Sequence, residues 1–125
     1  MLNDDTAYGF IIMSNFKLYL SGPMSGIPNK NYTQFNWAAW LLRQAGYETI
    51  NPWELDWADL TSTSWEEFLR RDIAALMKCD GVATLPNWKQ SKGARLEVYI
   101  AKALKYPVHP VSYWRKQCPR ILNTV

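Results

Sequence analysis

Hydrophobic positions follow two different periods along this chain. Short apolar or alternating runs predict four strands, at residues 16–20, 47–50, 82–85 and within 106–113. Helical spacing of apolar residues predicts three helices between them, at residues 32–45, 65–78 and 91–104. The prolines of the last run favour an edge strand, because proline cannot donate a ladder hydrogen bond.

The predicted order β-α-β-α-β-α-β is typical of an α/β domain with a mainly parallel sheet and helices on both faces. In such sheets ligands bind beyond the carboxyl ends of the strands. Three loops are therefore nominated for a binding site. They read SGPMSG (21–26), NPWELDW (51–57) and PNWKQSKG (86–93).

Glu97 stands in the middle of the apolar side of the helix predicted over 91–104. On a helical wheel it falls between Leu104 and Ala101. A buried carboxylate costs several kcal/mol unless it is paired or hydrogen-bonded. One interpretation is a first-turn glutamate favoured by the helix dipole, but with Ser91 as N-cap Glu97 lies beyond that turn. The other is a functional site, where perturbed carboxylates gather.

Asp72 repeats this anomaly on the preceding helix. It falls between Phe68 and Trp65, inside an apolar arc, while Arg70 and Arg71 lie outside it. A structural alternative is that Asp72 accepts a hydrogen bond from a neighbouring loop. Two acids in different environments are also what breaks glycosidic bonds, one as nucleophile and one as proton donor. By contrast Asp80, in the turn CDG, is typical of a residue bonding its own backbone.

The composition is that of one packed domain of 125 residues, with 48% hydrophobic and 20% charged residues. Regular patterning begins near Asn15. We therefore expect residues 1–14 to be a peripheral or disordered extension and residues 15–125 to form the domain. The net charge of +3 does not by itself argue for nucleic acid.

Several classes of protein are disfavoured by the same sequence. No run has membrane-spanning length, and no signal peptide is recognised, so we expect a cytoplasmic protein with no membrane partner. Cys79 and Cys118 are then expected as free thiols. They and the single histidine, His109, have no metal-ligand spacing, and we expect neither metal nor cofactor.

Ser91, Lys92 and Gly93 open the helix that carries Glu97. The N–H groups at a helix N-terminus favour anions, and Lys89 and Arg95 add positive charge, so a sugar phosphate fits there. The alternative is that Gly93 serves close packing.

Seven tryptophans are many for this length. Helical spacing predicts that Trp37, Trp40 and Trp65 belong to the core. Trp53, Trp57 and Trp88 lie in the nominated loops, where they either stack on a nucleobase or cover a small core.

Four segments together resemble one known family. They are KLYLSGPMSG, GYETINP, SWEEFLRRDIAALMKCDGVATLPNW and SKGARLEVYIAKALKYPV. In their order and spacing, over about residues 16–112, they resemble the nucleoside 2-deoxyribosyltransferase-like superfamily, and most of all its small uncharacterised phage and bacterial branch. The resemblance implies a flavodoxin-like three-layer sandwich with a central sheet of four or five strands and the first strand inside it. It also implies a homo-oligomer, a dimer or larger.

The resemblance also implies roles for particular residues. Glu97, in a Gly-x-x-x-Glu segment, matches the nucleophile, and Tyr19 matches the tyrosine that orients it. Asp72 matches the aspartate near the leaving base. Ser91 and Gly93 match residues that hold a 5′-phosphate. The turn of Ser21 and Gly22 matches a loop that lines the pocket, and the nominated loops add the substrate-binding candidates Pro23, Met24, Asn51, Pro52 and Trp88.

Two departures bear on the substrate. The loop before the Glu97 helix has lysines where the transferases often carry an aspartate for the base, which favours a phosphorylated ligand. The SGPMSGIPN loop lacks an arginine seen in some monophosphate hydrolases. We therefore expect cleavage of the N-glycosidic bond of a (deoxy)nucleoside 5′-monophosphate or related nucleotide, by hydrolysis or by transfer to another base. The alternative is a non-catalytic module that binds a nucleotide; a nucleic-acid partner is disfavoured because the cations form no stripe.

Overall fold

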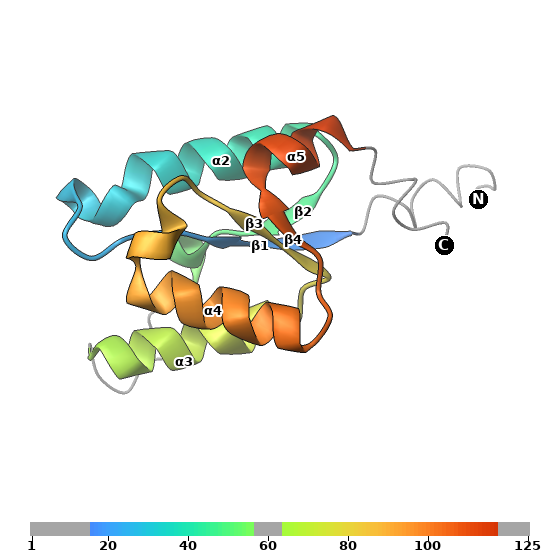
Figure 1. The fold of residues 1–125 in the computed structure, drawn as a ribbon. Coiled ribbons are helices and arrows are strands. Elements are labelled where there is room, and N and C mark those ends of the chain that lie inside the picture. The colour runs from blue at the N-terminus through green and yellow to red at the C-terminus, as the bar shows by residue number, and fades with distance from the viewer. Residues whose placement is uncertain (1–15, 57–63, 118–125) are drawn as a thin grey trace.

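Four parallel strands form the centre of the structure, a computed structural model that describes residues 16–56 and 64–117 (Figure 1). They are β1 (Lys17–Ser21), β2 (Glu48–Ile50), β3 (Gly81–Thr84) and β4 (Val108–Pro110), in the order β2-β1-β3-β4. Every neighbouring pair is parallel. The predicted parallel sheet is confirmed, with β1 inside it and the proline-containing strand at an edge.

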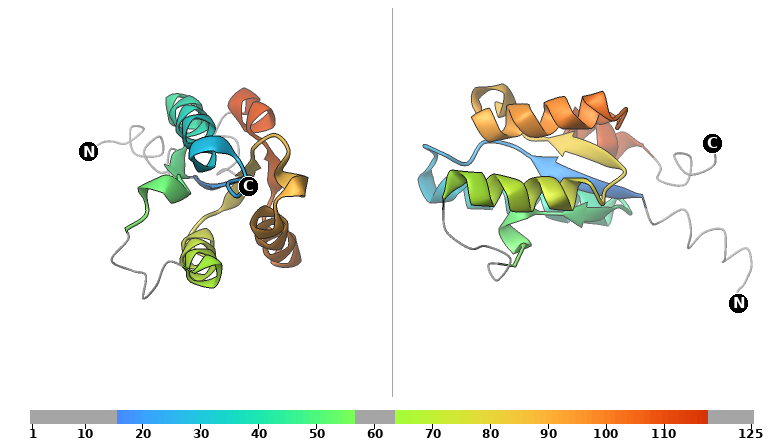
Figure 2. Two further views of the ribbon diagram at one scale, coloured as in Figure 1. Left: turned by 90° about the vertical axis from the view of Figure 1, so that its left-hand side faces the viewer. Right: turned by 90° about the horizontal axis from the view of Figure 1, so that it is seen from below.

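The helices complete a three-layer sandwich, as the views in Figures 1 and 2 show. One face of the sheet carries α2 (Tyr32–Gln44) and α5 (Val111–Lys116), and the other carries α3 (Trp65–Leu76) and α4 (Lys92–Ala103). This is the flavodoxin-like architecture that the resemblance implied. Short 3₁₀ turns are added in the connecting loops, at η1 (Pro28–Asn31), η2 (Pro52–Glu54) and η4 (Trp88–Gln90).

Serine N-caps fix where α3 and α4 begin. The hydroxyl of Ser64 accepts a hydrogen bond from the amide of Glu67 at 3.2 Å, and that of Ser91 from Ala94 at 3.1 Å. Each satisfies one of the amides that a helix leaves unpaired in its first turn. The starts of α3 and α4 therefore agree with those predicted from the sequence.

The alternation of β1 divides the core into two halves. Leu18 and Leu20 face α2 and α5, in a cluster that includes Phe35 and Trp114. Tyr19 faces the opposite side, with Leu76 of α3 and further apolar residues. Because successive side chains of a strand point to opposite faces, Ser21 lies on the same side as Tyr19.

The tryptophans of the helices are not core residues, and that prediction is wrong. Trp37 and Trp40 are 59% and 52% exposed, and Trp65 lies partly exposed at the start of α3. The buried face of α2 is instead Phe35, Ala38, Ala39 and Leu42. Trp37 and Trp40 stack on each other outside that face, with ring centroids 5.3 Å apart.

The helix α5 was not predicted, although it supplies the largest buried side chain. Trp114 is 1% exposed and its indole N–H donates to the carbonyl of Val82 at 2.9 Å. The helix α5 follows Pro110 directly and has only six residues, which are too few to show a helical period in the sequence.

Some predictions fall on residues that the structure does not describe. The N-terminal extension of residues 1–14, Trp57 and Cys118 lie outside the described ranges. The dimer or larger assembly stays a prediction. No helix in the described part of the chain is long and apolar enough to cross a membrane.

Thr49 of β2 is expected to limit the stability of this fold. Within the described ranges its buried hydroxyl has no hydrogen-bond partner, and an unsatisfied buried polar group costs about 1–3 kcal/mol. Thr49→Val replaces that hydroxyl by a methyl group of similar shape and should raise the free energy of unfolding by about 1 kcal/mol in urea titrations. Thr49→Ser, which keeps the hydroxyl, should not; an equal gain in both variants would contradict the explanation.

Candidate active site

Glu97 is buried where α4 packs on the sheet. Its residue is 6% exposed, and its buried neighbours on the helix are Ala94, Val98 and Ala101. Two hydroxyls of β1 hold the carboxylate, one on each oxygen: Tyr19 donates to Oε2 at 3.0 Å and Ser21 donates to Oε1 at 2.7 Å. The two donors are two residues apart on one strand, which puts both on the face that α4 covers.

Burial dominates the proton affinity of this carboxyl. Desolvation raises the pKa of Glu97 from 4.5 to about 8, and the negative charge of Asp72 acts in the same direction. The hydrogen bonds from Ser21 and Tyr19 oppose the rise. Burial and the nearby Glu97 charge also raise the pKa of Tyr19 well above 10. The phenol therefore keeps its proton at neutral pH and can act as a donor.

Asp72 is the second acid of the site, on α3. Both Nε and Nη2 of Arg71 donate to its Oδ1, at 3.2 and 3.1 Å. Burial raises the pKa of Asp72 from 3.8 to about 6, and the charge of Arg71 limits the rise. No hydrogen bond within the described ranges reaches Oδ2. The two acids differ in partners and in pKa, the pattern that separates an acid from a nucleophile.

Arg71 also connects this site to the loop after β2. Its Nη2 donates to the carbonyl of Pro52 at 3.2 Å. The side chain is 9% exposed, so it is a largely buried cation held by one carboxylate and one carbonyl. Sequence reasoning missed it, since on the wheel Arg71 lies outside the apolar arc of its helix.

These groups lie at the topological switch point of the sheet. The chain passes from β1 to β2 on one side and then to β3 on the other, so the switch point lies between the carboxyl ends of β1 and β3, where sheets of this kind bind their ligands. Ser21 and Thr84, the last residues of those strands, are register partners. Gly93 lies one helical turn before Glu97, and Ser91 caps the same helix. The structure therefore brings Tyr19, Ser21, Asp72 and Glu97 together, with the start of α4 beside them.

The loop after β1 has structural work of its own. A Cβ added at Gly22 would lie 2.7 Å from side-chain atoms of Leu85, so no larger residue fits there unless Leu85, the residue after β3, moves. The carbonyl of Pro23 accepts a hydrogen bond from Asn31 at 3.0 Å, and Met24 packs against the core on the α2 side. The substrate-binding roles of Gly22, Pro23 and Met24 stay predictions.

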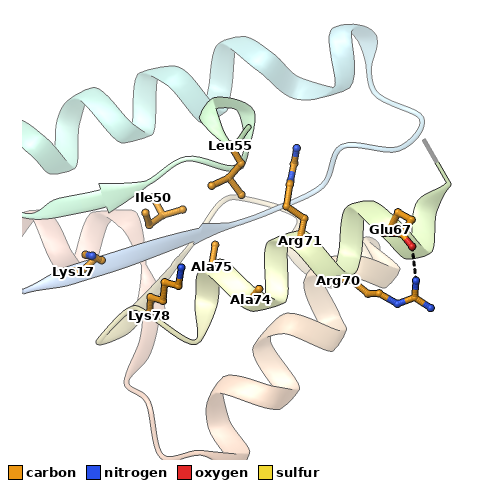
Figure 3. Close-up of a pocket in the computed structure, with 9 residues that line it drawn as sticks. All are labelled: Lys17, Ile50, Leu55, Glu67, Arg70, Arg71, Ala74, Ala75 and Lys78. Atoms are coloured by element: carbon orange, nitrogen blue, oxygen red, sulfur yellow. Dashed lines mark hydrogen bonds and ion pairs between the residues drawn. The ribbon is translucent and has the colours of Figure 1, made fainter. Parts of the chain in front are cut away.

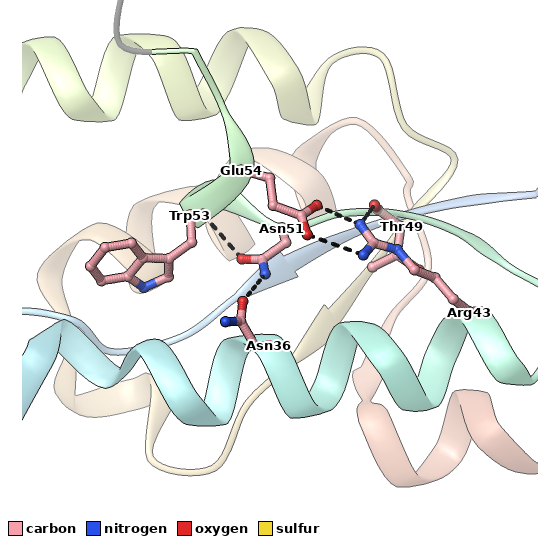
Figure 4. Close-up of polar contacts among 6 residues, drawn as sticks. All are labelled: Asn36, Arg43, Thr49, Asn51, Trp53 and Glu54. Atoms are coloured by element: carbon pink, nitrogen blue, oxygen red, sulfur yellow. Dashed lines mark hydrogen bonds and ion pairs between the residues drawn. The ribbon is translucent and has the colours of Figure 1, made fainter.

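Asn51 is tied into the fold at both ends of its amide, as Figure 4 shows. Its Oδ1 accepts from the amide of Trp53 at 3.1 Å, and its Nδ2 donates to Asn36 of α2 at 2.8 Å. These contacts hold the loop after β2 against α2.

Trp88 lies half-buried on η4 with the Lys89 ammonium 5.8 Å from its ring centroid. Ligand contacts of Asn51, Pro52 and Trp88 stay predictions.

A separate groove runs along the flank of α3 that faces β2, as Figure 3 shows. Its volume is about 380 Å³, and none of the predicted site residues lines it. Of its four cations, Lys17 pairs with Glu48, Arg70 with Glu67 and Arg71 with Asp72. Because three of the four cations are already paired within the described ranges, the groove is a weaker candidate than the switch point at Glu97. The described ranges hold no cluster of three potential metal ligands.

Comparison with known proteins gives a family and a fold. A family described as "Domain of unknown function (DUF4406)" matches residues 16–110. No curated protein sequence matches the chain. Among solved structures, the 2-deoxyribosyltransferase of the psychrotolerant bacterium Bacillus psychrosaccharolyticus is similar, with a TM-score of 0.58 and 21% sequence identity. The match covers 74% of this chain and 69% of that one. At this identity the likeness shows a shared fold, which agrees with the resemblance found in the sequence.

The raised pKa of Glu97 predicts how stability depends on pH. Its pKa is higher in the folded chain than in the unfolded one. Its contribution to the free energy of unfolding is therefore fully present below about pH 4.5 and is lost as the pH rises through about 8. Glu97→Gln cannot ionise and should escape this loss. The free energy of unfolding of Glu97→Gln, relative to wild type, should therefore rise between pH 4.5 and 8 in denaturant titrations. A difference that stays constant over that range would contradict the burial argument.

Proposed function

We propose that this chain, which belongs to the family described as a domain of unknown function (DUF4406), cleaves the N-glycosidic bond of a nucleoside 5′-monophosphate or related nucleotide. The observation that carries the proposal is the buried Glu97, held on both oxygens by hydroxyls at the switch point of the sheet. The fold shared with a 2-deoxyribosyltransferase supports glycosyl transfer as the class of reaction. The lysine-containing loop before α4 favours a phosphorylated substrate.

In the first step Glu97 is the nucleophile. One carboxylate oxygen attacks C1′ of the sugar, and the bond from C1′ to the base nitrogen breaks with its electron pair going to the base. The protonated carboxyl of Asp72 supplies a proton to that base, through the Oδ2 that Arg71 leaves free. The products are a glycosyl ester on Glu97, a neutral base and an ionised Asp72.

In the second step the ester is resolved. A water molecule, or a nitrogen of a second base, attacks C1′ while Asp72 accepts the proton that this nucleophile loses. The bond between C1′ and Glu97 breaks and the carboxylate is regenerated. Water makes the protein a hydrolase and a second base makes it a transferase. The hydroxyls of Tyr19 and Ser21 receive the negative charge that returns to Glu97.

The phosphate is assigned to the start of α4. The Ser91 hydroxyl caps the helix, and Gly93 exposes the backbone of its first turn where helix amides attract anions. A Cβ added at Gly93 would meet no atom closer than 3.9 Å, so packing alone does not require glycine at this position. A glycine that the fold does not need supports a role in close approach to a ligand.

Removing the charge of Glu97 should abolish turnover and spare binding. Glu97→Gln keeps the side-chain shape but lacks the nucleophilic carboxylate, so kcat should fall by orders of magnitude while nucleotide Kd stays within a few-fold. The release of free base from a panel of nucleosides and 5′-monophosphates measures kcat, and calorimetry measures the Kd of the nucleotide. Glu48→Gln, a half-exposed glutamate at the amino end of β2, is the matched control and should keep full activity.

Two other outcomes would decide against this assignment. Full activity in Glu97→Gln would end the nucleophile role. A wild-type chain that binds a nucleotide tightly and releases no base would favour the non-catalytic binding module, for which a neutral Glu97 at pH 7 is well suited as a hydrogen-bond donor.

The two pKa values predict a bell-shaped pH profile. The reaction needs Glu97 ionised and Asp72 protonated, and both conditions are met best between about pH 6 and pH 8. Because the proton donor Asp72 has the lower pKa, only a minority of molecules hold Asp72 protonated and Glu97 ionised at the same time. A plot of kcat/KM against pH should form a plateau between these two pKa values and fall on both sides. Initial rates from pH 5 to 9 test this. A rate that keeps rising above pH 8 would remove Asp72 as the proton donor.

The phosphate assignment predicts a preference among ligands. A 5′-monophosphate should bind at least about tenfold more tightly than its nucleoside, since charge-assisted hydrogen bonds contribute about 1.5–3 kcal/mol. Gly93→Ala should erase most of that preference, and its melting temperature should not fall because alanine favours a helix. Ser91→Ala should narrow the preference too, with loss of a helix cap. Equal affinity of wild type for both ligands would remove this phosphate site.

A further inference from the structure

We propose that Ser21 is a positioning residue that orients Glu97 and favours its ionised form, through the hydrogen bond from its hydroxyl to Oε1. The inference deepens the proposed function and rests on it for its meaning. It gives Ser21 a different role from the pocket-lining one that the sequence predicted. It also makes the support of Glu97 a pair of hydroxyls, in which Tyr19 is only one member.

The geometry favours Ser21 as the stronger of the two donors. Its bond to Glu97 is 2.7 Å, against 3.0 Å for Tyr19, and short bonds are typical when a hydroxyl donates to a charged oxygen. Ser21 itself is 1% exposed, so water does not compete for its proton. A serine hydroxyl has one proton to give, and here Glu97 receives it.

The sheet fixes the position of this hydroxyl. Ser21 is the last residue of β1 and pairs with Thr84 of β3, and its carbonyl accepts the amide of Leu85 at 2.9 Å. The donor is therefore attached to regular structure rather than to a loop. A donor placed in this way costs little reorganisation when the negative charge returns to Glu97 at the end of the reaction.

The surroundings of Glu97 contain few other groups that could take over this role. From α3 the carboxylate of Asp72 faces it, with Arg71 bound to that acid, and from β1 only Tyr19 adds a second donor. The strand β3 has no titratable residue. On β4, the ring of His109 stacks on the ring of Tyr113 in α5, and their centroids are 3.8 Å apart. Of the hydrogen bonds that lower the pKa of Glu97, that of Ser21 is the larger. Its loss should leave Glu97 more readily protonated.

Kinetics of Ser21→Ala test the role. Losing a hydrogen bond to a charged group should lower kcat by roughly tenfold to a hundredfold near pH 7, with KM within a few-fold. The alkaline break of the profile should move to higher pH, and the deficit should shrink above it, where Glu97 ionises even without Ser21. Ser21→Thr keeps a hydroxyl and should recover most of the rate. Thr49→Val, which removes a buried hydroxyl on the opposite face of the sheet, should leave the rate unchanged.

A second measurement needs no substrate. In protein labelled with ¹³C at glutamate Cδ, Glu97 is assigned by its absence in Glu97→Gln, and its pKa is read from the shift against pH. The titration should move to higher pH in Ser21→Ala and stay in place in Thr49→Val. An unmoved titration overturns the inference, even if Ser21→Ala is slow. A wild type that cleaves no nucleotide would instead defeat the proposed function, while a moved titration would still support the ionisation role of Ser21.

Discussion

A carboxylate inside an apolar helix face, held by two hydroxyls from one strand, is the interaction on which the rest of this structure depends. Leaving Glu97 unpaired there would cost several kcal/mol, so the burial of α4 on the sheet requires Tyr19 and Ser21 as partners. Both partners are in place only if β1 keeps its register beside β3 and α4 keeps its rotation. The acid therefore links the specificity of packing to the chemistry of the site.

Glu97 and Asp72 differ in pKa because the elements around them supply different hydrogen-bond partners. Glu97 has neutral hydroxyls for partners, which limit the rise of its pKa without cancelling it. Asp72 has a buried guanidinium on one oxygen, and its pKa rises less. Arg71 also binds the carbonyl of Pro52, so the loop after β2 and the charge state of Asp72 are mechanically connected. A change in the loop after β2 should therefore alter the pKa of Asp72.

The sequence allowed the alternation of strands and helices, the helix starts and the two acids on apolar helix faces to be predicted, because each depends on local period or on a serine cap. Other features depend on long-range geometry. The bond from Ser21 to Glu97 joins residues 76 positions apart and follows from the packing of α4 on β1. Trp37 and Trp40 were wrongly placed in the core, since their spacing fits either side of α2 and the small face of Ala38 and Ala39 is the one that packs. Arg71 has no sequence signal, because only the fold brings Pro52 to it.

The division of the core by β1 has a consequence for changing this protein. The half under α2 and α5 holds Leu18, Leu20 and Trp114 but neither of the two acids. It can be repacked, as at Thr49, with the sheet standing between the altered atoms and the two acids. The half under α3 and α4 has less freedom, because burial and the neighbours on that side set the pKa values of Glu97 and Asp72. The stability of the fold and the acidity of Glu97 and Asp72 can thus be altered separately, one on each side of a single sheet.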